Sequence, residues 1–121
     1  MLPQRLPRIA LFHKDKQLPG EIALATSFVS RLRGLLLTSS LEEGMGLLIV
    51  PCGSIHMLGM RYGLEAVFLS SEGRVLKIIP YLSPWFGLGF CWGAKATLEW
   101  NPGNAAMYGV TTGDILSWKR V

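Results

Sequence analysis

The sequence contains little of the material from which several classes of protein are built. It has only two cysteines and two histidines, and charged residues make up 17% of its 121 positions. Two cysteines cannot form the disulfide framework that stabilises small secreted domains. A hydrophobic fraction of 50% is also far above what is typical of disordered chains. These features indicate a domain that folds around one hydrophobic core.

Long uninterrupted apolar segments are missing as well. Two uncharged stretches, 44–60 and 78–94, are each broken by proline and glycine, and neither reaches the ~18–20 apolar residues that a membrane-spanning helix needs. The first residues, 1–17, contain no apolar run of signal-peptide length. We therefore predict a soluble, cytoplasmic protein without a membrane span.

Common nucleotide-binding and hydrolase motifs are absent. Gly87 and Gly89 lack the third glycine of a dinucleotide fingerprint, and there is no phosphate loop, Gly-x-Ser-x-Gly or paired-carboxylate motif. The formal net charge is +4, but most of the basic residues are scattered along the chain. We therefore expect no nucleic-acid partner and no cofactor, and a binding protein rather than an enzyme.

Turn residues and short apolar runs are what the sequence has in quantity. Fourteen glycines and seven prolines suit short strands joined by tight turns. The patterns predict strands at 8–13, 21–26, 46–50, 54–57, 65–70, 74–81, 94–100 and 114–119, and helices at 28–36 and 104–108. We predict a mainly β fold, a small barrel or two-sheet sandwich of about seven or more short strands with one or two short helices. We expect residues 1–121 to form a single domain with 1–7 as a loose N-terminal arm.

Three of these strands are predicted in more detail. Residues 65–70 should be mostly core, and the polar link that ends in Gly73 predicts a hairpin with 74–81. The strand at 54–57 is expected to continue the sheet of 46–50. Residues 94–100 alternate, so that Leu98 and Trp100 point to one side of the sheet and Thr97 and Glu99 to the other.

An ordered series of motifs runs from about residue 21 to residue 118. The motifs are Arg33-Gly34-Leu35, Gly44-Met45, Ile55-His56-Met57-Leu58-Gly59-Met60-Arg61, Val67-Phe68-Leu69, Gly73-Arg74-Val75, Ala94, Leu98-Glu99, Gly103, Gly109 and Gly113-Asp114. In this order they resemble the family catalogued as domain of unknown function 192. The resemblance implies a small β-barrel or sandwich related in shape to the jelly rolls, with no established reaction, cofactor or catalytic residue.

The chain departs from that family pattern after Arg61. The family typically has a proline, an aliphatic residue and an aspartate there, whereas this chain reads Tyr62-Gly63-Leu64-Glu65. Glycine loosens a position that proline would fix, and Glu65 extends its carboxylate one methylene further. Ser70 stands where the family usually has an acidic residue.

Cys52, His56 and Cys91 form the first candidate site. Two thiolates and an imidazole are ligands that zinc prefers, and such a set with one open position is a known catalytic arrangement. The same residues suit a thiol-dependent site in which His56 activates a cysteine. The alternative is that both cysteines are reduced, small hydrophobic residues.

Arg61 is the centre of the second candidate site, with His56, Glu65 and one of Glu99 or Asp114. An arginine after a glycine-bounded bend can bind a carboxylate or phosphate through two parallel hydrogen bonds. The alternative is an ion pair between Arg61 and Glu65 that only holds the bend.

The third candidate is the uncharged segment 81–92, which is rich in aromatic residues. Such a loop either closes one end of the core or exposes a contact surface. We hypothesise a binding module for a small ligand or a partner peptide, formed by His56, Arg61, Glu65, Trp85, Phe86 and Trp92. The alternatives are the metal- or thiol-dependent site and an assembly factor that presents a surface.

Overall fold

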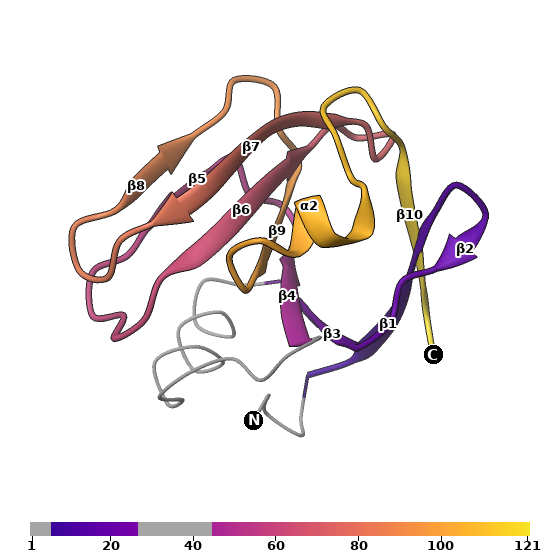
Figure 1. The fold of residues 1–121 in the computed structure, drawn as a ribbon, viewed down its shortest axis with the longest axis horizontal. Coiled ribbons are helices and arrows are strands. Elements are labelled where there is room, and N and C mark those ends of the chain that lie inside the picture. The colour runs from indigo at the N-terminus through magenta and orange to yellow at the C-terminus, as the bar shows by residue number, and fades with distance from the viewer. Residues whose placement is uncertain (1–5, 27–44) are drawn as a thin grey trace.

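The computed structural model describes residues 6–26 and 45–121, and these fold into a curled, mainly β half-barrel (Figure 1). The elements are β1 (Arg8–His13), β2 (Lys16–Gln17), β3 (Glu21–Ala25), β4 (Met45–Ile49), β5 (Ser54–His56), β6 (Leu64–Leu69), β7 (Val75–Leu82), β8 (Leu88–Phe90), β9 (Ala96–Trp100), α2 (Asn104–Tyr108) and β10 (Leu116–Arg120). The mainly β prediction is confirmed. The helix expected at 28–36 lies outside the described residues, as does most of the arm expected at 1–7. Within the described ranges, no helix has the length and apolarity to span a membrane.

Most strands belong to one large sheet. Its order is β10-β1-β3-β4-β9-β6-β7, with β2 paired to β1. β3 and β4 run parallel, while the other paired neighbours are antiparallel. A parallel pair needs a long crossover, and the chain between Ala25 and Met45 provides its length.

The sheet curls until its two ends meet beside the β6–β7 turn. Arg74, directly after that turn, forms an isolated bridge with Ile115, directly before β10. The amide of Leu116 donates to the carbonyl of Gly73. Gly73 has φ +85°, and a Cβ at this position would overlap the carbonyl oxygen of Leu116. The closure therefore requires glycine at this turn.

The centre of the large sheet is buried on both faces. Leu47, Ala66 and Phe68 belong to the hydrophobic cluster on one face, whereas Val67 and Leu98 belong to the cluster on the other. Every residue of β6 is buried, which confirms that this strand is core. Every residue of β9 is buried too, including its polar members.

The expected role of residues 54–57 is wrong in one respect. β5 does not extend the sheet of β4 but pairs antiparallel with β8 in a separate two-stranded sheet, the β5–β8 sheet. β4 ends before Pro51, which has no amide to donate to a neighbouring strand. The β5–β8 sheet lies at one end of the molecule, and β1, β2 and β10 lie at the other (Figure 1).

Candidate functional site

β8 is oriented by a glycine that points toward the core. Gly89 is buried, and a Cβ there would come within 2.8 Å of Ile79 Cδ1 and 3.3 Å of Phe68 Cζ. Neighbours in a strand point to opposite faces, so Leu88 and Phe90 point away from the core and are exposed. This reverses the usual pattern, in which large apolar residues face inward.

The segment before β8 is fixed by backbone hydrogen bonds to the end of β5. The amide of Trp85 donates to the carbonyl of Met57 (3.0 Å), and the amide of Met57 donates to the carbonyl of Gly87 (2.9 Å). Trp85 has φ +68°, which is a strained conformation for a bulky residue. Such strain persists only where the surrounding structure holds it, so we infer that the segment has one fixed conformation.

Large apolar side chains are exposed along this segment and the β5–β8 sheet. Phe86 is 89% exposed and Trp92 is 88% exposed, and the ring centroids of Phe90 and Trp92 lie 6.4 Å apart. We call the following six exposed residues the aromatic surface: Leu58, Trp85, Phe86, Leu88, Phe90 and Trp92. This exposure favours the second of the two alternatives for 81–92, a contact surface rather than a lid.

Three basic residues lie on or close in sequence to the aromatic surface. Lys77 Nζ donates to the carbonyl of Phe90 (3.0 Å), Arg61 is exposed in the turn between β5 and β6, and Lys95 is exposed after Trp92. Within 45–100 two carboxylates, Glu65 and Glu99, are buried. The third carboxylate within 45–100 is that of Glu72, which lies in the β6–β7 turn beside Ser117 and Trp118.

Glu65 points away from the other residues of the hypothesised site. Its Oε1 accepts hydrogen bonds from Trp100 Nε1 (2.6 Å) and from the amide of Ala105 in the first turn of α2 (2.8 Å). The residue is only 3% exposed. The described residues contain no Arg61–Glu65 ion pair, so that alternative is wrong. The reason is that Glu65 projects to the face of the sheet occupied by Trp100.

His56 lies on the opposite side of the large sheet from Glu65. It is half-buried and pairs with Leu88 across the β5–β8 sheet. Its neighbour Ile55 belongs to the hydrophobic cluster on one face of the large sheet, whereas Trp100 belongs to the cluster on the other face. His56 is therefore close to the aromatic surface.

Cys52 and Cys91 lie on neighbouring segments. The amide of Cys91 donates to the carbonyl of Gly53 (3.0 Å), and both side chains are half-buried against the same hydrophobic cluster. Their Sγ atoms contact backbone carbonyls of Ser54 and Trp92. Across residues 6–26 and 45–121, no three His, Cys, Asp or Glu side chains are grouped to hold a metal ion. The zinc set of Cys52, His56 and Cys91 is therefore not assembled there.

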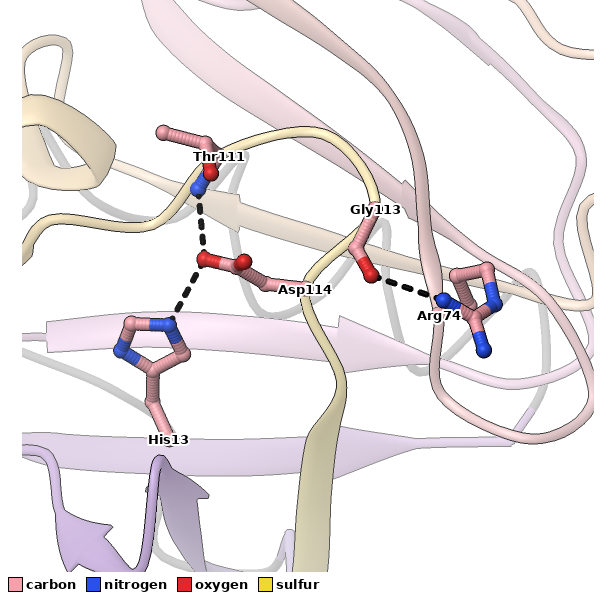
Figure 2. A network of polar contacts seen from close by, with 5 residues as sticks. All are labelled: His13, Arg74, Thr111, Gly113 and Asp114. Atoms are coloured by element: carbon pink, nitrogen blue, oxygen red, sulfur yellow. Dashed lines mark hydrogen bonds and ion pairs between the residues drawn. The ribbon is translucent and has the colours of Figure 1, made fainter.

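A polar network that the sequence did not reveal joins β1 to the loop before β10 (Figure 2). His13 Nε2 lies 2.8 Å from Asp114 Oδ2, and the amide of Thr111 donates to the same oxygen (3.0 Å). His13 is only 6% exposed. The Thr111 amide, followed by His13, lowers the pKa of the Asp114 carboxyl. Arg74 Nη1 braces the loop from the other side by donating to the carbonyl of Gly113.

We expect Asp114 to make the stability of the fold depend on pH in acid. A carboxyl whose pKa is lowered by folding stabilises the protein above its unfolded pKa, and this stabilisation is lost as pH falls through the folded pKa. The window therefore lies below the ordinary value of 3.8. Thermal unfolding between about pH 5 and pH 2 should show a steeper loss for the wild type than for Asp114→Asn. Glu72→Gln is the control and should lose stability with falling pH as the wild type does. If Asp114→Asn and the wild type lost stability equally steeply, the result would argue against the network.

The order of motifs noted in the sequence is matched by the comparison with protein families. The model of the family DUF192, described as an uncharacterized ACR, matches residues 10–118. The chain belongs to this family. A relative of this DUF192 chain is a UPF0127 protein from Thermococcus sibiricus, which is 29% identical over 111 residues, with 88% of the chain and 71% of the relative covered.

Two solved structures resemble the DUF192 chain over nearly its whole length. One is a proposed transcription regulator from Sinorhizobium meliloti 1021, with a TM-score of 0.78 and 21% identity, covering 93% of this chain and 92% of that one. The other is a protein of unknown function from Novosphingobium aromaticivorans, with a TM-score of 0.79 and 20% identity, covering 98% of this chain and 91% of that one. At these identities the likeness shows the fold.

Proposed function

We propose that the protein is a binding module that docks a segment of a partner protein on the aromatic surface. The observation that carries this proposal is the reversed pattern of β8, in which Gly89 faces the core and Leu88 and Phe90 face outward. Contiguous exposed apolar patches on folded proteins mark interaction sites, and aromatic residues are enriched among the anchors of interfaces.

The fixed shape of the segment before β8 supports the same function. A surface that is already held in one conformation loses little entropy when a partner binds. The backbone bonds between Met57, Trp85 and Gly87 hold it, and a Cβ at Gly87 would come within 2.9 Å of the Met57 side chain. The strained backbone of Trp85 suits a position where an anchor must point outward.

Basic residues next to the aromatic surface indicate the chemistry of the partner. Lys77 contacts Phe90, and the exposed Arg61 and Lys95 follow Leu58 and Trp92 by three residues each, so the complementary segment is apolar with acidic residues at its flanks. Opposite charges at a rim mainly speed association and exclude wrong partners. We assign the apolar contacts to Trp85, Phe86 and Trp92 and the polar contact to Arg61, with His56 at the edge. Glu65 is not part of this surface because its carboxylate is buried under α2.

A selection from a phage-displayed library of random peptides tests the proposal. Enriched peptides are expected to combine large apolar residues with aspartate or glutamate. Their affinity should fall by about tenfold or more in Phe86→Ser and in Trp92→Ser, because anchor residues at the centre of an interface account for most of its affinity. Met107→Ser is the matched control, since Met107 is also an exposed apolar residue but lies on α2.

Two results of this selection would contradict the proposal. One is a failure to enrich any peptide, and the other is enrichment of peptides that bind Phe86→Ser and Met107→Ser equally well. Circular dichroism of each variant checks that it is folded before binding is measured.

A further inference from the structure

A cavity of about 530 Å³ is lined by residues of β1, the β1–β2 turn, the loop before β10 and β10 itself. These elements lie at the end of the molecule opposite the β5–β8 sheet (Figure 1). The volume of the cavity lies in the range of small-molecule sites. The lining residues are Phe12, Lys14, Asp15, Asp114, Ile115 and Ser117. None of these residues belongs to the aromatic surface, so the two regions are separate.

One wall of the cavity is a carboxylate that the fold fixes in place. Asp114 Oδ2 is held by the buried ring of His13 and by the amide of Thr111 (Figure 2). The loop that carries Asp114 is itself tied to Arg74 through the carbonyl of Gly113. A charged group held by several partners is the kind of preorganised contact that a binding site uses. The hydrogen bonds from the Thr111 amide and from His13 lower the pKa of Asp114 and so favour its ionised form.

The two-residue turn between β1 and β2 also lines the cavity. Its residues, Lys14 and Asp15, have φ +52° and +64°. Turns of this kind favour asparagine and glycine, because both central residues need positive φ. This chain instead has a lysine and an aspartate there, and both residues line the cavity. Strained residues persist at ligand sites more often than elsewhere.

Phe12 and Ile115 are the apolar residues of the lining. Phe12 and Ser117 are partners in the β1–β10 register, so their side chains lie next to each other on the same face of the sheet. Lys119 Nζ lies 5.6 Å from the centroid of the Phe12 ring, a contact that helps to hold the ring. Ile115 adds an exposed aliphatic side chain.

We propose that this cavity binds a small zwitterion with an apolar side chain, of the amino-acid class. The ammonium group of the ligand would contact Asp15 and Asp114, its carboxylate would contact Lys14, and its side chain would cover Phe12 and Ile115. A simple anion would face two carboxylates, and a simple cation would face Lys14. A molecule with both charges and an apolar group satisfies every part of the lining.

Three related compounds test this inference on the ¹⁵N-labelled full chain. L-Phenylalanine carries both charges, phenethylamine lacks the carboxylate, and 3-phenylpropionate lacks the ammonium group. Phenylalanine is expected to give saturable amide shifts at residues 12–15 and 114–117. Each fragment should bind about tenfold more weakly, since each loses one charge-assisted contact.

Variants of the exposed turn separate the two charges. Lys14→Met should weaken phenylalanine binding about fivefold without weakening that of phenethylamine, and Asp15→Asn should weaken both. Asparagine tolerates positive φ, so the second variant keeps the turn. Glu72→Gln, outside the cavity, is the control. The inference is overturned if phenylalanine gives no saturable shifts there, if the three compounds bind equally, or if either fragment binds more tightly than phenylalanine.

Discussion

Replacing Gly73 with alanine is expected to lower the free energy of unfolding by about 3 kcal/mol or more, the range of severe single substitutions. The new Cβ would meet the carbonyl oxygen of Leu116, a backbone atom that cannot rotate away. The positive φ of Gly73 adds about 1 kcal/mol of strain for a residue with a side chain. Because this turn closes the curled sheet against β10, the substitution should open that closure.

Gly93→Ala is the matched control for Gly73→Ala. The two glycines have almost the same φ, +85° and +86°, but a Cβ at Gly93 meets nothing within 4 Å. Gly93→Ala should therefore cost only the strain, about 1 kcal/mol. Urea unfolding of both variants measures the difference. If the two variants lose the same stability, the close approach of Gly73 to the Leu116 carbonyl is not needed for the closure.

Replacing Glu65 with alanine should also cost about 3 kcal/mol, because two buried donors lose their acceptor. Trp100 Nε1 and the amide of Ala105 both donate to Glu65 Oε1. Glu65→Gln keeps an oxygen at that position and should cost less, about 1 kcal/mol. Urea unfolding provides the measurement for both variants.

Glu72→Ala serves as the reference for Glu65, since Glu72 is an exposed glutamate in the β6–β7 turn. It should change stability by no more than about 0.5 kcal/mol. If Glu65→Ala lowered the free energy of unfolding as little as Glu72→Ala, the Glu65 carboxylate would not be a structural support of α2.

Local patterns in the sequence were enough for most of the elements. The predicted strand 8–13 and helix 104–108 have the bounds that the structure shows, and the β6–β7 hairpin forms around Gly73. These elements depend on residues close together in the chain, such as alternating apolar side chains or a glycine at a turn. The family resemblance was confirmed over residues 10–118.

Features that depend on distant residues could not be predicted in the same way. In β8 the large apolar residues face outward and a glycine faces the core. The sequence pattern of these residues therefore did not indicate a strand that pairs with β5. His13 and Asp114 are 101 positions apart, and neither is part of a recognisable motif for a paired site. The alternation of 94–100 predicted the directions of Thr97 and Glu99, but not that both would be buried, because burial depends on what packs on each face.

The departure from the family pattern at Gly63 has a physical reason in this fold. A Cβ at Gly63 would overlap the ring of Tyr81 on β7. Glycine therefore makes room for the tyrosine where the family typically has a proline. Glu65, two residues further on, keeps a carboxylate in the strand and uses it to bind Trp100 and α2.

The most direct test of the aromatic surface is to map a selected peptide on the ¹⁵N-labelled protein. Amide shifts are expected at 57–58 and 85–92, with little change at the β1–β2 turn, because the peptide should lie over Trp85, Phe86 and Trp92. The same titration of Phe86→Ser should show much smaller shifts at equal concentration. Shifts centred on the cavity of Lys14 and Asp114, or scattered over the molecule, would contradict a docking surface on the β5–β8 sheet.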